Sequence, residues 1–404
     1  MSKVVISVAN KLVQKVQGLL EYAWFVSPKK SPFSVWHEDR VLPKFIKAID
    51  EDDKDYQEMM ADTLSWGCNT KVRFSGVFVV SNAKFIMNVR LKSHRRHPDS
   101  RKAIVCTRNY RPFKYPGGQS FLFFLSCIRK ILIHQRKKSS HDIISGNVAL
   151  LGNCAYENDN YYHFWADVIT DIWYIRQHLK EEDLPDYYVT PHANMPWQWD
   201  ILKLCGVNKS QVISYAKYDV SSIEKLIIPV RDKGAYNLPP WLCRAMHDMC
   251  GWSPKLQKGE RLIYVSRADA DRRRISNEEI LRSRLQEVGF EIHTLNGLSI
   301  DEQQQLFASA AIICAPHGAA LTNLVWCGPE AVIIDLLSDR YLIPCFRQLA
   351  AQNKLFYYAY ACRQLEGVKS GLIGDIIVSE TQIESVLDVV SRHAVHVNQA
   401  ENII

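Results

Sequence analysis

Short apolar runs alternate with longer amphipathic stretches along the second half of the chain. Four of these runs have the length of a buried strand, and they lie at Arg261–Val265, Glu291–Leu295, Ala311–Ala315 and Ala331–Leu336. The stretches between them have the residue spacing of helices. Strands that alternate with helices predict βαβ units, and four such units in sequence predict a doubly wound parallel sheet.

Helix boundaries in this half of the chain are marked by capping residues. Asn277 predicts the start of a helix that Gly289 ends. Ser299, followed by Glu302 three residues later, predicts a capping box for the next helix. A short helix is expected over Ala320–Trp326, after a glycine-containing turn.

A less regular alternation of the same kind starts at Val148. Its apolar runs predict strands at Val148–Leu151, Tyr187–Val189, Gln211–Ile213 and Leu226–Ile228. Helices are expected over Tyr161–Leu179 and Met195–Cys205, and the turn-rich stretch Gly251–Gly259 separates the two halves. We therefore expect one Rossmann-like domain over residues 146–255, a second over residues 256–375, and a C-terminal helix and tail over residues 376–404.

Residues 1–145 are expected to form an N-terminal α+β extension. Strands are predicted at Gly76–Val80 and Lys84–Val89, with a turn at Ser81–Asn82 between them. An apolar stretch that begins at Phe121 ends in the basic run Arg136–Lys138. This pattern is typical of an amphipathic helix that lies on a membrane surface, and it is also typical of a buried helix that ends in charged residues. Both interpretations stay open.

Composition places the chain among folded globular proteins. Its 404 residues are 47% apolar and 23% charged, and no run approaches the roughly 18 apolar residues of a membrane-spanning helix. The amino-terminal residues have no signal-peptide pattern. The 11 cysteines are an odd number without a Cys-x-x-Cys pair, which argues against a disulfide framework and against a thiolate zinc site. We therefore expect a cytoplasmic protein of two or three domains.

The net charge is +7, and lysine and arginine crowd between Lys84 and Lys138. This region fits a solvated basic face, an attraction to anionic lipid at the inner face of the cell membrane, or a phosphate-bearing substrate. No recognised nucleic-acid module accompanies the charge, so nucleic acid is not an expected partner.

The segment after the third predicted strand of the second sheet begins a helix. Gly318, Ala319 and Ala320 are small enough to let backbone N–H groups approach a phosphate, which the helix dipole also favours. His317 is expected to donate to a phosphate or ribose oxygen, and Asn323 to point back toward the loop. A tight turn with a packed histidine is the alternative interpretation.

Arginines crowd in the loop after the first strand of the same sheet. Arg267, Arg272, Arg273 and Arg274 lie within eight positions. Such crowding is costly unless anions compensate it, and a diphosphate is the expected ligand.

Carboxylates accompany these arginines. Asp269 and Asp271 form an Asp-x-Asp, but the flanking arginines compete for both side chains, so no metal site is expected. Glu278 lies just inside the cap of the next helix. It is expected either to bind a ribose hydroxyl or to complement the helix dipole.

In the first predicted sheet, His163 and Asp167 lie four residues apart on an expected helix. This spacing puts both side chains on one face, where either one can act as a base toward a hydroxyl nucleophile. A structural histidine–aspartate pair has the same spacing, so both interpretations stay open.

Together, these three segments resemble glycosyltransferase family 61. The matching pieces are Asn160–Asp167, Tyr264–Glu278 and Pro316–Leu324. The resemblance covers roughly residues 148–340. The sequence departs from the family pattern at Glu330, which is expected at the edge of the donor pocket.

The resemblance implies a GT-B type fold, in which two Rossmann-like domains face a cleft and the C-terminal domain holds a nucleotide sugar. It also implies an inverting enzyme that needs no metal, and it makes Asp167 or His163 the base. The expected donor-binding residues are Arg267, Arg273, Arg274, Asn277, Glu278, His317, Gly318, Ala319, Ala320 and Asn323.

We therefore expect a hexosyl-, pentosyl- or N-acetylhexosaminyltransferase that requires no cofactor and acts in capsular or other surface-polysaccharide synthesis. It would move a sugar from a nucleotide-diphosphate donor to a hydroxyl of a glycan or lipid-linked glycan acceptor, with peripheral membrane contact left open. Two alternatives also stay open. One is a sugar-nucleotide epimerase or hydrolase of the same fold, and the other is a non-catalytic nucleotide-binding scaffold protein.

Overall fold

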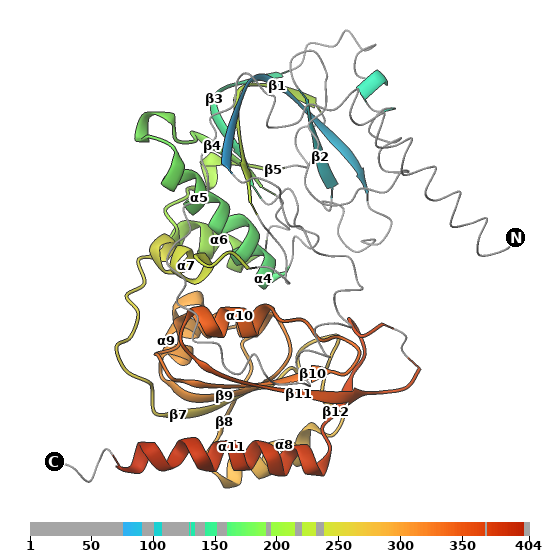
Figure 1. Cartoon of the computed structure of the whole chain (residues 1–404). Coiled ribbons are helices and arrows are strands. Elements are labelled where there is room, and N and C mark those ends of the chain that lie inside the picture. Colours follow the sequence, from blue (N-terminus) through green and yellow to red (C-terminus); the bar gives the residue numbers. More distant parts are fainter. Residues whose placement is uncertain are drawn as a thin grey trace, which may run out of the picture. The chain divides into compact units, whose positions relative to one another are not determined.

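The computed structural model describes residues 76–90, 101–106, 129, 131–133, 142–151, 160–190, 195–214, 220–231, 238–367 and 370–399. These residues fall into two compact units, 76–231 and 238–399, which are described separately (Figure 1). Most of the apolar stretch after Phe121, and the basic run Arg136–Lys138, lie outside the described residues. Each unit contains a six-stranded sheet of mainly parallel strands, so the chain is a mixed α/β protein.

The sheet of the first unit combines parallel strands with two antiparallel ones. Its strands are β1 (Gly76–Arg90), β2 (Arg101–Cys106), β3 (Asp142–Leu150), β4 (Tyr187–Thr190), β5 (Val212–Ser214) and β6 (Val220–Val230). Their spatial order is β2-β1-β6-β3-β4-β5. The strands from β6 to β5 in this order run parallel, whereas β1 pairs antiparallel with both β2 and β6. The four strands predicted between residues 148 and 228 are confirmed.

β1 is a single strand of 15 residues, so the predicted turn at Ser81–Asn82 is wrong. Asn82 has a left-handed backbone conformation with a φ of 52°, which asparagine adopts more readily than most residues. Pairing with β6 continues on both sides of Asn82. The hydrogen bonds to a strand distant in sequence therefore outweigh the local turn signal.

The four parallel strands, numbered in chain order, have the spatial order 3-2-1-4, which is that of the first four strands of a Rossmann fold. The order reverses between β3 and β6. The helical segment after β3 consists of α4 (Tyr161–His163), the π-helix η3 (Phe164–Ile169) and α5 (Thr170–His178). The helix predicted over Tyr161–Leu179 is thus confirmed, with a π-helical middle that the sequence pattern does not predict.

Shorter helices complete the first unit. They are η4 (Glu181–Asp183), α6 (Pro196–Leu204) and η5 (Lys209–Gln211). α6 follows β4 and confirms the helix predicted from Met195. Pro196 at its first position suits a helix start, because the missing N–H would have no partner within the helix there.

The sheet of the second unit is parallel except at one edge. Its strands are β7 (Arg261–Val265), β8 (Glu291–His293), β9 (Ala310–Pro316), β10 (Val332–Ser338), β11 (Phe356–Gln364) and β12 (Ile376–Ile377). Their spatial order is β12-β11-β10-β9-β7-β8, and only β12 is antiparallel. The five parallel strands have the order 2-1-3-4-5, a flavodoxin-like arrangement. The order reverses between β7 and β9.

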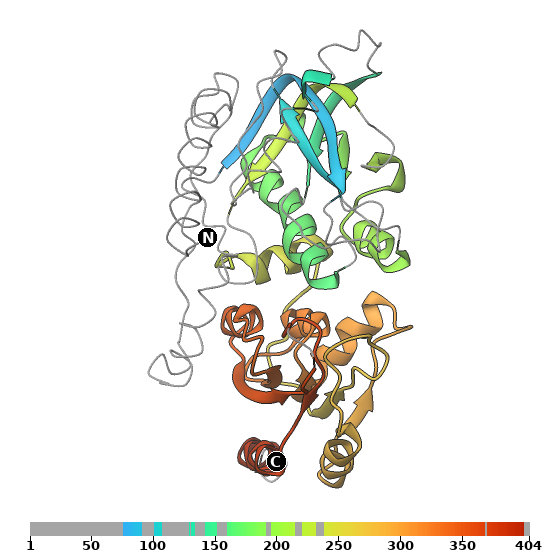
Figure 2. The same cartoon turned by 90° about the vertical axis from the view of Figure 1, so that its right-hand side faces the viewer.

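Helices cover both faces of this second sheet. They are α7 (Leu242–Cys250), α8 (Glu278–Glu287), α9 (Ile300–Ala308), the 3-10 helix η6 (Ala319–Trp326), α10 (Cys345–Gln352) and α11 (Glu380–Gln399). Figures 1 and 2 show α9 and α10 on one face of the sheet and α8 and α11 on the other. Every residue of β9 and β10 is consequently buried, which explains their continuous apolar sequence.

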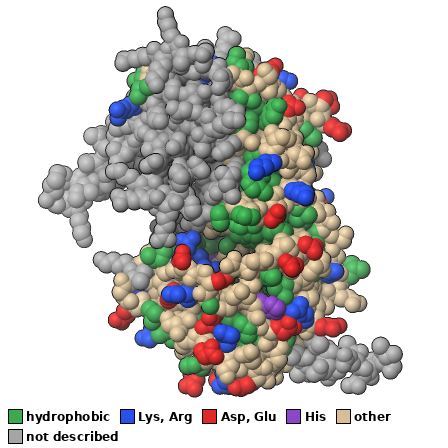
Figure 3. Space-filling view, turned by 180° about the vertical axis from the view of Figure 1, so that it is seen from behind, with side chains coloured by type: hydrophobic (Ala, Val, Ile, Leu, Met, Phe, Trp, Pro, Cys, Tyr) green, Lys and Arg blue, Asp and Glu red, His purple; other side chains and the backbone are tan. Residues whose placement is uncertain are grey.

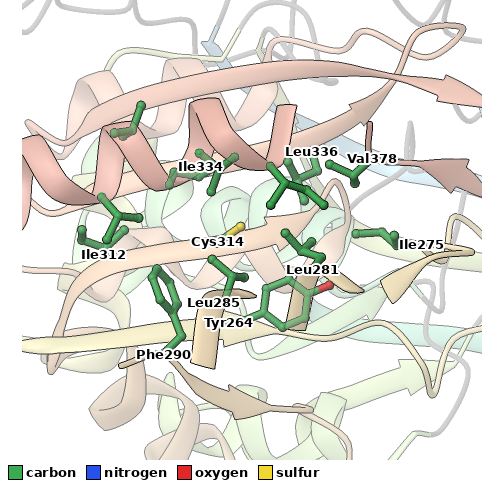
Figure 4. Close-up of a cluster of buried hydrophobic side chains, with 14 of the residues drawn as sticks. Tyr264, Ile275, Leu281, Leu285, Phe290, Ile312, Cys314, Ile334, Leu336 and Val378 are labelled. Carbon is green, nitrogen blue, oxygen red and sulfur yellow. The ribbon is translucent and has the colours of Figure 1, made fainter. Parts of the chain in front are cut away.

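The core between the sheet and α8 is apolar. Leu281 and Leu285 of α8 lie in one cluster with Ile312, Cys314 and Ile334 of the central strands (Figure 4). These side chains are at most 1% exposed. Removal of this apolar area from water stabilises the unit.

The helix boundaries follow the predicted caps in most places. Gly289 has a φ of 94° and ends α8, whose N-cap position is Asn277, although the Asn277 side chain makes no capping hydrogen bond. In the predicted capping box, the Ser299 N–H donates to the Glu302 carboxylate over 2.7 Å. The segment after Gly318, in contrast, is a 3-10 helix rather than an α-helix.

α7 belongs to the second unit. Its His247 Nε2 lies 2.6 Å from the carbonyl oxygen of Val325. Its Cys243 N–H donates to Gln352 Oε1 over 3.0 Å. These bonds tie α7 to η6 and α10.

Within the described ranges, no helix is both long enough and apolar enough to cross a bilayer. On the face seen in Figure 3, acidic and basic side chains are interspersed over the described surface. The charge on this face therefore gives no preference for an anionic partner.

Candidate functional site

The two loops predicted to bind a phosphate meet in the second unit. One loop follows β7 and the other follows β9, and the strand order reverses between these two strands. In open α/β sheets, such a reversal separates the loops at the carboxyl ends of the strands and leaves a crevice for ligands. The strand order of the sheet thus brings both predicted loops to its ligand-binding end.

Gly318 and Arg267 join these two loops directly. A Cβ atom placed at Gly318 would overlap Arg267 Nη1 and would lie 2.7 Å from Arg267 Cζ. The φ of Gly318 is −179°, which any residue can adopt. Glycine is therefore needed here for the close approach of the guanidinium and not for backbone conformation.

The positive charge of Arg267 lies among more arginines than carboxylates, with Asp269 as the opposing charge. Burial, and then the neighbouring Arg273 and Arg272, lower the pKa of Arg267 to about 10, so the group still stays charged at neutral pH. Its Nη2 donates to the Arg272 carbonyl oxygen over 3.2 Å, while its buried Nε has no hydrogen-bond partner among the described residues. A half-buried guanidinium with an unused donor is a suitable partner for an oxyanion.

Tyr341 connects the arginine loop to the histidine, and the sequence analysis missed it. Arg273 Cζ lies 5.1 Å from the centre of the Tyr341 ring, a cation–π distance. The same ring lies 5.9 Å from the ring of His317. Tyr341 follows β10, so its position at a strand end in the same sheet was the available signal.

His317 is buried at the end of β9 with a specific partner. Its Nδ1 lies 2.8 Å from Oδ2 of Asp335, which is fully buried in β10. The backbone N–H of His317 donates to the Leu336 carbonyl oxygen over 2.9 Å. Asp335 was also missed, although a charged residue inside an apolar strand is a recognisable signal.

Two other predicted donor residues hold the arginine loop to its own unit. Arg274 bonds Asp375 through its backbone N–H and through Nη2, at 2.9 and 3.3 Å. The Asn277 side chain exchanges two hydrogen bonds with the backbone of Val378 instead of capping α8. These contacts fix the loop where it meets β12 and α11.

Glu278 and Asn323 are likewise bound within the protein. Glu278 Oε1 accepts hydrogen bonds from Tyr264 and Ser266, each over 2.8 Å. Asn323 is fully buried, donates to Gln303 over 3.0 Å and accepts from the indole N–H of Trp326. The structure thus places both side chains in the framework of the site.

The small residues of the motif lie at the start of η6. Ala319 and Ala320 are half-buried and directly follow Gly318. Glu330 lies at the opposite end of β10, before the strand begins, so it is remote from the loops at the carboxyl ends. The expectation that Glu330 borders the donor pocket is therefore wrong.

Asp269 and Asp271 are exposed beside the arginines. Among the residues that the structure describes, no three histidine, cysteine, aspartate or glutamate side chains are grouped as metal ligands.

In the first unit, His163 and Asp167 form the predicted pair. His163 Nδ1 lies 2.7 Å from Asp167 Oδ2, and Asn160 caps the helix by accepting the His163 N–H. The side chain of His163 is 19% exposed and that of Asp167 is 4% exposed. A buried carboxylate that holds a more exposed imidazole is the arrangement of an oriented general base.

A buried arginine holds the π-helix in which Asp167 lies. Arg231, at the end of β6, donates from Nη2 to the Ala166 carbonyl oxygen over 2.8 Å and to Thr170 Oγ1 over 2.6 Å. Its Nε donates to Asp171 Oδ1 over 2.8 Å. π-helical turns within α-helices often occur at functional sites. Arg231 and Asp171 were not predicted, because their role depends on contacts between β6 and α5.

The family model for glycosyltransferase 61 matches residues 161–334 of this chain. The match begins with α4 and ends within β10, so it spans the histidine–aspartate pair, the arginine loop and the His317–Gly318 turn. The family resemblance inferred from these motifs is confirmed for this part of the chain. A search of curated proteins found no match.

Proposed function

We propose that the protein is an inverting glycosyltransferase that uses a nucleotide-diphosphate sugar. The proposal starts from the match of residues 161–334 to the glycosyltransferase 61 family model. Glycosyl transfer itself follows from the family. Inversion, the donor class and independence from a metal are our proposal.

The observation that carries the proposal is the guanidinium of Arg267, whose buried Nε has no hydrogen-bond partner among the described residues, beside Gly318 at the carboxyl ends of β7 and β9. In an inverting transfer, the acceptor oxygen attacks the anomeric carbon while the bond from that carbon to the diphosphate breaks. The diphosphate leaves with the bonding electron pair and gains negative charge. Arg267, with Arg273 held over Tyr341, can stabilise that charge without a metal.

The second requirement of the reaction is a base for the acceptor hydroxyl. We propose that the His163–Asp167 pair accepts this proton. His163 is the more exposed member, and Asp167 holds its ring. The π-helix and Arg231 keep the two side chains in register.

We further propose a GT-B type enzyme that acts in the cytoplasm on a glycan or lipid-linked glycan during capsular or other surface-polysaccharide synthesis. The sugar would be a hexose, pentose or N-acetylhexosamine.

A thermal-shift screen of nucleoside mono- and diphosphates identifies the nucleotide first, because a ligand that binds the native state raises the melting temperature of the protein. Incubation of the matching sugar nucleotides with and without acceptor glycans then tests transfer. Turnover of the donor alone would instead identify a hydrolase or epimerase, and binding without turnover would identify a scaffold.

Replacing Arg267 with methionine is expected to weaken the binding of the nucleoside diphosphate by about tenfold to a hundredfold, because one charge-assisted contact is lost. Isothermal titration calorimetry measures this affinity. Arg392→Met, at an exposed arginine of α11, is the matched control and should bind as the wild type does. Equal affinity of the Arg267 variant and the control would contradict the proposed diphosphate site.

Replacing Gly318 with alanine is expected to displace the Arg267 guanidinium and to weaken nucleotide binding by about tenfold. Folding should be little affected, because the atom in the way is the end of a flexible side chain. In an Arg267→Ala background, the same glycine substitution should have almost no further effect on affinity. An equal loss in both backgrounds would show that Gly318 acts independently of Arg267.

A further inference from the structure

Asp335 is a buried carboxylate in the middle of an apolar strand. It is fully buried in β10, where its register neighbours are Ala315 of β9 and Ala359 of β11. Its Oδ2 lies 2.8 Å from His317 Nδ1 and accepts the Tyr357 hydroxyl over 2.6 Å. Its Oδ1 is buried and has no hydrogen-bond partner among the described residues. A half-satisfied buried carboxylate is costly, so its presence calls for a functional reason.

The hydrogen bonds at Asp335 define the state of the histidine ring. An ionised carboxylate only accepts hydrogen bonds, so the nitrogen that faces it must carry a proton. Opposite an ionised Asp335, Nδ1 is the ring nitrogen of His317 that donates. Nε2, the other ring nitrogen, forms no hydrogen bond with any residue in the described ranges, and 5% of the side chain remains exposed.

The ring of His317 is also held in place by its neighbours. The Phe346 ring of α10 lies 4.9 Å from it, and the Tyr341 ring lies 5.9 Å from it on another side. The backbone N–H of His317 is bound to β10. Three elements thus fix the orientation of one imidazole beside Arg267 and Gly318.

We propose that Asp335, supported by Tyr357, is a positioning residue that fixes the proton of His317 on Nδ1 and presents Nε2 to the bound nucleotide. Asp335 acts only through His317 and does not itself touch the ligand. The second part of this inference rests on the proposed function, because it needs a nucleotide at this end of the sheet. The tautomer of the ring does not depend on that function.

Nitrogen NMR of protein labelled with ¹⁵N-histidine tests the first part. The His317 signals are assigned by their loss in the His317→Gln variant. In the wild type and in Asp335→Asn, which keeps an acceptor oxygen, Nδ1 should be protonated. Asp335→Leu removes the acceptor, so the ring should lose its preference for a proton on Nδ1. Asp301→Asn, at an exposed position of α9, should leave these signals unchanged. A ring protonated only on Nε2 in the wild type would overturn the proposal even if Asp335→Leu fails to fold.

Titration with UDP and GDP tests the second part. The added nucleotide should shift Nε2 of His317 more than Nδ1, and His317→Gln should bind about tenfold more weakly than the wild type. Asp335→Leu should lose affinity to a similar extent, and the double variant should bind no more weakly than either single variant. Additive losses would show that Asp335 acts by another route and would overturn the positioning role. If neither nucleotide binds the wild type, the proposed donor class fails, while the NMR result still decides how Asp335 acts on His317.

Discussion

The Asp167→Asn variant is expected to transfer sugar with a kcat about 10³-fold below that of the wild type, within the range attributed to general acid–base catalysis. Asparagine keeps the shape of the side chain but removes the charge that holds His163 Nδ1 at 2.7 Å. Affinity for the nucleotide should stay unchanged, because the proposed nucleotide site lies in the second unit. Steady-state kinetics with saturating donor and acceptor, together with calorimetry of nucleotide binding, measures both quantities.

Asp183→Asn is the matched control for this substitution. Asp183 is an exposed residue of η4 in the same unit, so its variant should have wild-type kcat. His163→Gln should reduce kcat as strongly as Asp167→Asn, and the two substitutions together should be no worse than either one, because the pair acts as a unit. If both single variants keep wild-type kcat, the base is another residue.

The Arg231→Met variant is expected to lower the free energy of unfolding of the first unit by about 3–5 kcal/mol. The substitution removes the ion pair with Asp171, which is fully buried, and the hydrogen bonds to Ala166 and Thr170. Hydrogen–deuterium exchange of peptides from residues 161–178, measured at increasing urea concentration, reports on this unit.

Two further variants make the test of Arg231 specific. Lys180→Met removes an exposed ion pair with Glu182 in the same unit and should cost at most about 1 kcal/mol. The double variant Arg231→Met with Asp171→Leu should recover about half of the loss, since replacing a buried ion pair with apolar residues is often tolerated. A cost for Arg231→Met no larger than that of the exposed pair would exclude a role of Arg231 in holding the π-helix.

Strands and caps were predictable from local sequence, because their signals lie within a few residues. The apolar run Arg261–Val265 matches β7 residue for residue, and the Ser299–Glu302 capping box forms as expected. The π-helix and the continuity of β1 were not predictable, because both depend on strands that pair or pack from far along the chain. Arg231 lies more than sixty residues after Ala166, whose carbonyl it binds.

The candidate site was predictable as a set of loops but not as a set of contacts. Arg267, His317 and Gly318 are brought together as expected. Asn277 and Asn323, in contrast, make hydrogen bonds that hold the loops in place. A motif cannot distinguish a side chain that touches a ligand from one that supports the residue that does, because both depend on the same local sequence. Only the positions of the neighbours separate these roles.

The close approach of Arg267 to Gly318 also constrains how this protein can vary. The two positions share one volume, which either a long side chain at residue 267 or a Cβ at residue 318 can occupy. In a library randomised at both positions and selected for transfer, a large residue at 318 should appear only with a short residue at 267. Such variants would have to obtain their positive charge from another part of the arginine loop, so the selected sequences would reveal which arginine can replace Arg267.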